Sequence, residues 1–308
     1  MPKYPVDRRE RPESPSGRDI MESALDRTFN PFKHGMPLNQ PPLSDIFAGK
    51  RAKFVFDDFE IEYEFEDSEN MKWFLPGVGG GWQKEHYECY ESSAGNLYFM
   101  FHEKTISAPP MCRAFAIDLD NRQVTMLKCS VGIENYGNND VEITAYFGYI
   151  DFSDGAAPPV GRHCYSTEMV RKAVMWHCNN WNLIHYYVSK NYFINQVMIG
   201  QEGLIATEPA RHIKLRENVF LFHLVEITGP GGMGADIMDF KALKGVGMFY
   251  GCGATMVVCN GFQREAGKFL TKDDLIKFEQ VFEKEGERAA VAAMGVDIES
   301  VNTRIIHL

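Results

Sequence analysis

Residues 183–187, Leu-Ile-His-Tyr-Tyr, put an imidazole and a phenol two positions apart, at His185 and Tyr187. In a β-strand, side chains at this spacing point to the same face of the sheet. An imidazole titrates near neutral pH and can both accept and donate a proton, while a phenol hydroxyl can orient a ligand oxygen by hydrogen bonding. We therefore predict a catalytic pair, with ordinary packing of both side chains as the alternative.

A second candidate is a carboxylate at the end of an apolar strand, Glu226. Within residues 218–226, alternation puts Phe220, Phe222, Leu224 and Glu226 on one face and His223 on the other. Burial on an apolar face would raise the pKa of Glu226 and suit it to general acid or base catalysis. Alternatively the carboxylate reaches water or pairs with an arginine. Both faces are apolar, so alternation leaves open which face points inward.

Further side chains are predicted to bind the substrate around these three catalytic candidates. Tyr186 could orient a ligand through its hydroxyl group, and His212 and Arg113 could bind an anion, with solvated surface positions as the alternative. The predicted substrate-binding set is Tyr186, Gln196, His212, Phe222, Leu224, Glu103 and Arg113.

The strand that contains Glu226 has a counterpart in the first half of the chain. Residues 96–103 resemble residues 218–226, with an Asn-to-Asn shift of 218 − 96 = 122 positions, and Asp118 recurs as Asp239 after 239 − 118 = 121. Residues 49–56 and 170–176 give a third match. These matches predict a duplicated β-domain. In this alignment Glu103 corresponds to Glu226, and Glu62 and Glu64 correspond to His185 and Tyr187, so we expect function where these pairs differ.

The elements that must position these groups are short antiparallel strands. Between residues 50 and 151 apolar and polar residues alternate and no segment keeps helical spacing, and about eight further strands follow between residues 171 and 262. The pattern predicts an all-β protein of two tandem antiparallel barrels, 41–157 and 158–268, connected near residues 154–159. A flexible arm with a short helix, 1–40, precedes them. In the segment 269–308, Thr271 is expected to cap a helix that runs to about Ala293.

The second half resembles the C-terminal domain of the MoaF family, the molybdenum-cofactor biosynthesis protein F family. The resemblance rests on His185 and Tyr187, on Gln196, on residues 203–208 and on Glu217 to Phe222 with Glu226. It is specific over about 165–262 and diffuse over 45–150. It implies lipocalin-like (calycin) barrels related in fold to phenolic acid decarboxylases. The chain departs from the family at Asn195, Leu224, Val225 and Ile227, where the family has Trp, Trp, Arg and Lys, so a different ligand is expected.

Composition and charge narrow the classes of function. The chain has 308 residues, 44% of them hydrophobic, and a net charge of −10, which argues against nucleic acid as the main partner. No apolar run approaches the ~20 residues that cross a bilayer, so no membrane partner and a cytoplasmic location are expected. Seven cysteines without a Cys-x-x-Cys pair predict neither a zinc site nor a disulfide framework. The glycine-rich segments 79–81 and 229–234 lack phosphate-loop context and are expected to be mobile loops at the barrel mouths.

These observations predict an enzyme without cofactor or metal, of the lyase, isomerase or cyclase type, that acts on a small apolar or aromatic molecule. One alternative is a non-catalytic carrier or sensor that uses the same pocket. Another is a structural partner in a complex, bound through the arm or through the helix at 271–293, and a homodimer is possible.

Overall fold

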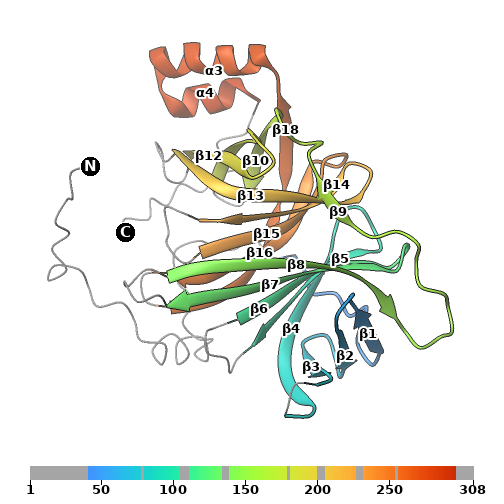
Figure 1. Ribbon diagram of the computed structural model, residues 1–308. Helices are drawn as coiled ribbons and strands as arrows, with labels where there is room; N and C mark the ends of the chain where they lie inside the picture. The colour runs from blue at the N-terminus through green and yellow to red at the C-terminus, as the bar shows by residue number, and fades with distance from the viewer. Residues whose placement is uncertain are drawn as a thin grey trace, which may run out of the picture.

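The structure is a computed structural model that describes residues 41–77, 80–104, 111–133, 139–178, 181–199, 205–226, 232–253 and 256–295. The predicted arm and short helix within 1–40, and residues 79 and 229–231 of the two glycine-rich segments, lie outside these residues. The described chain consists mostly of β-strands, as predicted, arranged as a closed barrel, a second large sheet and a C-terminal helical segment (Figure 1).

The first barrel contains eight antiparallel strands in sequential order, and β1 also pairs with β8 to close it. Alternation builds it: on β2, Ile61, Tyr63 and Phe65 are buried while the glutamates between them are half-buried on the outer face. The strands are β1 (Arg51–Val55), β2 (Glu60–Phe65), β3 (Asn70–Phe74), β4 (Gln83–Glu91), β5 (Leu97–Lys104), β6 (Met111–Asp118), β7 (Gln123–Ile133) and β8 (Asn139–Asp151).

The second sheet repeats this sequential order of pairing from β10 to β17, and β9 adds to it by pairing with β13. β17 and β18 lie at opposite ends of the sheet, yet only Glu265 separates them in the chain, and its N–H donates to the carbonyl of His177 on β10 at 3.0 Å. β17 and β18 are thus nearly continuous in the chain, with a bend at Glu265, and together they connect the two ends of the sheet. The strands are β9 (Cys164–Ser166), β10 (Ala173–Cys178), β11 (Trp181–Tyr186), β12 (Tyr192–Ile199), β13 (Ile205–Arg216), β14 (Val219–Val225), β15 (Gly232–Asp239), β16 (Lys244–Gly253), β17 (Met256–Arg264) and β18 (Ala266–Leu270).

The residues that recur in the sequence hold equivalent turns. Asn96 and Asn218, which precede β5 and β14, both have positive φ, at 49° and 59°. Asp118 accepts the N–H of Asn121 at 2.9 Å, and Asp239 accepts that of Lys241 at 2.9 Å, so each aspartate stabilises the turn after its strand.

The alignment of Glu62 and Glu64 with His185 and Tyr187 is wrong. The two glutamates lie on the outer face of β2 and pair with Lys53 and Arg51, whereas His185 and Tyr187 are 1% exposed. The two pairs imply an offset of 185 − 62 = 123, one more than the 122 between Asn96 and Asn218. A shift of one residue moves a strand position to the opposite face, so an offset that varies by one cannot fix the face.

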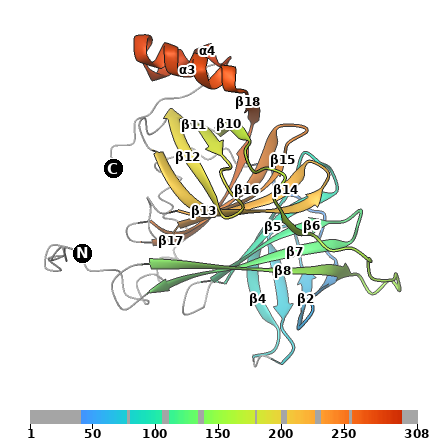
Figure 2. The same ribbon diagram turned by 45° about the horizontal axis from the view of Figure 1, so that its top comes forward.

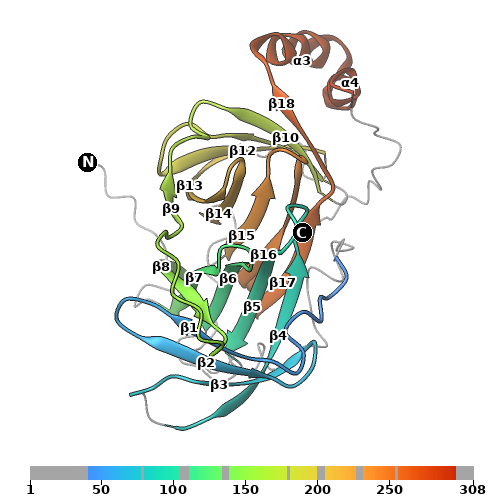
Figure 3. The same cartoon turned by 90° about the vertical axis from the view of Figure 1, so that its right-hand side faces the viewer.

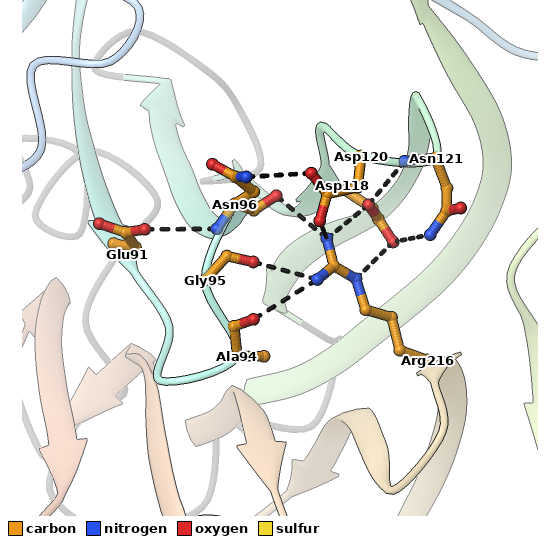
Figure 4. Close-up of polar contacts among 8 residues, drawn as sticks. All are labelled: Glu91, Ala94, Gly95, Asn96, Asp118, Asp120, Asn121 and Arg216. Atoms are coloured by element: carbon orange, nitrogen blue, oxygen red, sulfur yellow. Dashed lines mark hydrogen bonds and ion pairs between the residues drawn. The ribbon is translucent and has the colours of Figure 1, made fainter.

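The two halves pack against each other through the outer faces of β4–β7 and β13–β16 (Figures 2 and 3). This shared core is apolar and includes Phe99, Leu127, Leu221, Ile237 and Met248. At its edge, the Arg216 guanidinium donates to both carboxylate oxygens of the buried Asp118, at 2.7 and 2.9 Å, and to the carbonyls of Ala94, Gly95 and Asn96 (Figure 4).

The C-terminal helix is divided into two. α3 (Lys272–Glu285) starts at the predicted cap, where Thr271 and Asp274 form a reciprocal capping box, but it ends at Gly286, whose φ is 84°. α4 (Glu287–Ala293) then folds back, and Phe278, Val291 and Met294 cover Met175 and Ile184 on the outside of the second sheet. The single helix to Ala293 was wrong because a left-handed glycine ends a helix.

Candidate functional site in the second sheet

His185 and Tyr187 point into the interior of the second sheet, on the same face as predicted. The Tyr187 hydroxyl lies 3.4 Å from His185 Nδ1, 3.4 Å from the donating Trp176 Nε1 and 3.5 Å from Met238 Sδ. Phe222 packs on both rings, with centroids 5.7 Å from each. The two groups therefore form a hydrogen-bonded pair between aromatic walls.

Burial fixes the protonation of this pair. Loss of water, and then the positive charge of Arg264, hold the pKa of His185 well below its ordinary value. Burial likewise raises the pKa of Tyr187. Both side chains are thus neutral near pH 7, so the pair can donate and accept hydrogen bonds but carries no charge.

The interior also holds an ion pair that the sequence analysis missed. Arg264 on β17 donates from Nε to Asp236 Oδ2 on β15 at 2.7 Å, and both side chains are almost completely buried. Gly245 and Gly247 on β16 leave the necessary room, because a Cβ at Gly247 would collide with Asp236 and the carbonyl of Ala235. The Gly-x-Gly spacing within a strand was the available signal, since an interior glycine marks a close approach.

Several inward polar atoms in this region have no hydrogen-bond partner in the described part of the chain. They are Nη1 of Arg264, Nε2 of His212 and Oδ1 of Asn195. His212 is buried between Tyr187 and Phe222, at 4.5 and 4.8 Å between ring centroids, and Asn195 lies opposite His185. Such atoms are costly when left unsatisfied, so they mark where a bound polar group would be stabilised.

Phe222 and Leu224 belong to the interior core of the second sheet. Glu226 lies on the same face of the strand, which is therefore the face directed to the interior. Ala210 on β13 pairs with Leu224 on β14 in an antiparallel register. Glu208 lies two positions before Ala210 and Glu226 two positions after Leu224, so the two glutamates are opposite each other. Burial, and then the charge of Glu208, raise the pKa of Glu226 to about 7. A carboxyl group with this pKa can both give and take a proton near neutral pH.

Two of the predicted substrate-binding residues lie on the opposite face. The Tyr186 hydroxyl donates to Gln196 Oε1 at 3.0 Å, and Tyr186 packs with the cluster beneath α3 and α4. Tyr186 follows His185 in sequence, and Gln196 follows Asn195, the residue that pairs with His185. Successive side chains of a strand point to opposite faces, so neither Tyr186 nor Gln196 joins the interior. His223 lies two positions after Leu221 and is therefore likewise on the outer face.

Arg113 and Glu103 belong to the other barrel. Arg113 lies on β6 and contacts Trp73 and His102 of the first barrel. Glu103 is in β5 opposite Cys112, and its side chain is outside the described residues. Neither residue is grouped with His185, because the shared core separates the interior of the first barrel from that of the second sheet.

In the described residues, no group of three or more His, Cys, Asp or Glu side chains is arranged to hold a metal ion. No helix among them is long and apolar enough to cross a membrane. No two of the described cysteines form a disulfide with each other, and Cys89, Cys112 and Cys129 are buried.

Comparison with known proteins gives one family. No curated protein matches the chain. Among solved structures, it is similar to "a putative beta-lactamase from Burkholderia vietnamiensis" with 15% identity and a TM-score of 0.27, over 37% of this chain and 98% of that one. The family model of the MoaF C-terminal domain matches residues 163–269, a range that spans β9 to β18. His185, Tyr187, Arg264, Asp236 and Glu226 all lie within this range, so the part of the chain that holds the candidate site is similar to the MoaF C-terminal domain.

Proposed function

We propose that the interior of the second sheet binds a small, largely apolar or aromatic organic molecule and that the chain is a cofactor-free enzyme that transfers one proton on it. One observation carries the proposal: Arg264 Nη1, His212 Nε2 and Asn195 Oδ1 point into an aromatic interior without a partner in the described residues. A ligand with one or two polar groups would satisfy these atoms, while its apolar body would contact Phe193 and Phe222.

The protonation states suggest a division of roles. Tyr187 keeps its proton and donates a hydrogen bond to a ligand oxygen, and His185 orients that hydroxyl group. Glu226 has the pKa closest to neutral and is the group we expect to give or take the proton. With aromatic walls that fix the ligand conformation, this set fits a lyase, an isomerase or a cyclase.

A second candidate is a carrier or sensor that binds without turnover. It is favoured by the neutral state of His185 and Tyr187, because a carrier needs affinity and no proton transfer. We further propose that the two halves arose by internal duplication, which is supported by the equivalent turns at Asp118 and Asp239.

The test begins with a thermal-shift screen of small aromatic and apolar metabolites against the full chain. Compounds that raise the melting temperature are then incubated with the protein, and products are analysed by mass spectrometry. We expect at least one compound to be converted, with turnover lost in a His185→Ala, Glu226→Gln double variant and unchanged in Glu217→Gln, which alters an exposed carboxylate. Saturable binding without any product would favour the carrier, and unchanged turnover in the double variant would refute the roles of both residues.

A further inference from the structure

The first barrel contains a polar cluster of its own that the proposed function does not use. Tyr63 comes from β2, Trp73 from β3, Glu85 from β4, His102 from β5 and Arg113 from β6, and all five side chains are buried. Trp73 and His102 lie near the ends of their strands, and Glu85 and Arg113 near the starts of theirs. In an antiparallel barrel these positions share one end, so the cluster lies toward the connections β3–β4 and β5–β6.

His102 engages the acidic member of the cluster. Its Nε2 contacts Glu85 Oε2, and its Nδ1 faces the Tyr63 hydroxyl at 3.4 Å and Arg113 Nη1 at 3.5 Å. With its proton on Nε2, the imidazole donates to Glu85 and accepts from Tyr63 or Arg113. The single carboxylate of the cluster is therefore bound to His102.

Arg113 is a buried cation with no counter-ion among the residues that the structure describes. Its side chain is 6% exposed, and its guanidinium carbon lies 4.4 Å from the centre of the Trp73 ring. Among the described residues, no carboxylate oxygen lies within 4.0 Å of an Arg113 nitrogen, the distance that defines an ion pair. The aromatic contact offsets only part of the cost of burying a charge.

A second cation faces the same space. Lys128 on β7 lies directly opposite Arg113, and it alternates with Val124 and Met126, which belong to the core of the first barrel. Its side chain is therefore directed to the interior. Like charges opposite each other on neighbouring strands are destabilising, and this pair has no described carboxylate between its members.

We propose that the first barrel binds the carboxylate of a small organic acid between Arg113 and Lys128. A carboxylate matches the two parallel donors of a guanidinium group, and its negative charge between the two cations reduces their mutual repulsion. Tyr63, whose pKa is raised by burial, retains a proton that it can donate to the same group. The aromatic rings of Tyr63 and Trp73 provide an apolar wall for the body of the acid. This site lies in the other barrel and does not depend on the proposed function.

The test titrates the full chain with benzoate, and with benzyl alcohol as its neutral analogue, while tryptophan fluorescence is recorded. We expect saturable binding of benzoate that is at least tenfold tighter than that of benzyl alcohol. The fluorescence change should disappear in Trp73→Phe and persist in Trp176→Phe, because Trp176 lies in the second sheet, outside the proposed site. No saturable binding of benzoate, equal affinity for both probes, or a signal that disappears only with Trp176→Phe would overturn the proposal.

Charge variants then locate the carboxylate. Arg113→Gln should weaken benzoate binding at least tenfold and Lys128→Gln several-fold, whereas Arg51→Gln, which removes an exposed cation on β1, should have no effect. Circular dichroism and melting curves verify folding. If Arg113→Gln does not fold, the affinity of Arg113→Lys and Lys128→Gln for benzoate tests the site instead. Arg113→Lys keeps the positive charge but loses the paired donors of the guanidinium group, so it should still bind benzoate more weakly. Unchanged affinity in every folded Arg113 and Lys128 variant would contradict the site.

Discussion

At the scale of single residues, burial decides what the ionisable groups of the second sheet can do. Desolvation leaves His185 neutral and brings Glu226 close to a neutral pKa, so the carboxylate is the better group for proton transfer. The sequence predicted that His185 and Tyr187 share a face, because their spacing alone determines it. It could not predict Arg264 with Asp236, since a pair 28 positions apart depends on the sheet register.

The raised pKa of Glu226 makes stability depend on pH. The folded pKa of about 7 lies above the ordinary value of 4.5, so the folded state binds more protons and stability falls as pH rises from about 4.5 through 7. Glu226→Gln removes this penalty. It should be more stable than the natural chain at pH 8, by up to about 3 kcal/mol, and similar to it at pH 4.5. Urea unfolding at both pH values measures the difference, with Glu217→Gln as the control. An equal effect at both pH values would contradict the assignment.

At the scale of elements, alternation predicted most strands within a few residues, because one wet and one buried face leave a clear period of two. It missed β9, whose three residues are too short to show a period, and it missed the break between α3 and α4. Glycines in β16 were not interpreted either. Their role depends on what approaches from β15, which is a property of the assembled sheet.

Gly247 should therefore tolerate no side chain. Gly247→Ala forces a Cβ against Asp236 and the backbone of Ala235, and should destabilise the fold by roughly 3 kcal/mol or more. Gly234→Ala is the matched control. There the nearest atoms are those of the Phe249 and Leu224 side chains, at 3.3 and 3.5 Å, which can move slightly. Thermal unfolding compares the two variants, and equal melting temperatures would show that β16 does not pack as described.

At the scale of the whole molecule, two β-structures are connected by an apolar interface with a polar edge. Arg216 crosses this edge from β13 to the turns of the first barrel (Figure 4). The tandem arrangement could be predicted from the repeated sequence, but the interface could not, because both faces of β14 are apolar and either could have faced the partner. Packing assigns the face with Leu221 to the interface and that with Phe222 to the interior.

Removing this contact should weaken the connection between the halves. Arg216→Met leaves the fully buried Asp118 without its cation and should cost roughly 2–4 kcal/mol of stability. Arg122→Met removes a guanidinium from the more exposed Asp154 and should cost much less stability than Arg216→Met, because water screens this pair. Denaturant unfolding, followed by tryptophan fluorescence, compares them. Equal losses would mean that the Arg216 contact contributes no more than a surface ion pair.

The central claim, that the interior of the second sheet is a ligand site, is tested most directly by a crystal structure with the compound that gives the largest thermal shift. We expect density for the compound inside the second sheet, with a polar atom within hydrogen-bond distance of Arg264 Nη1 or His212 Nε2, and an apolar part against Phe222. Density for the compound only in the first barrel or on the surface, with the second-sheet interior unchanged, would contradict the claim.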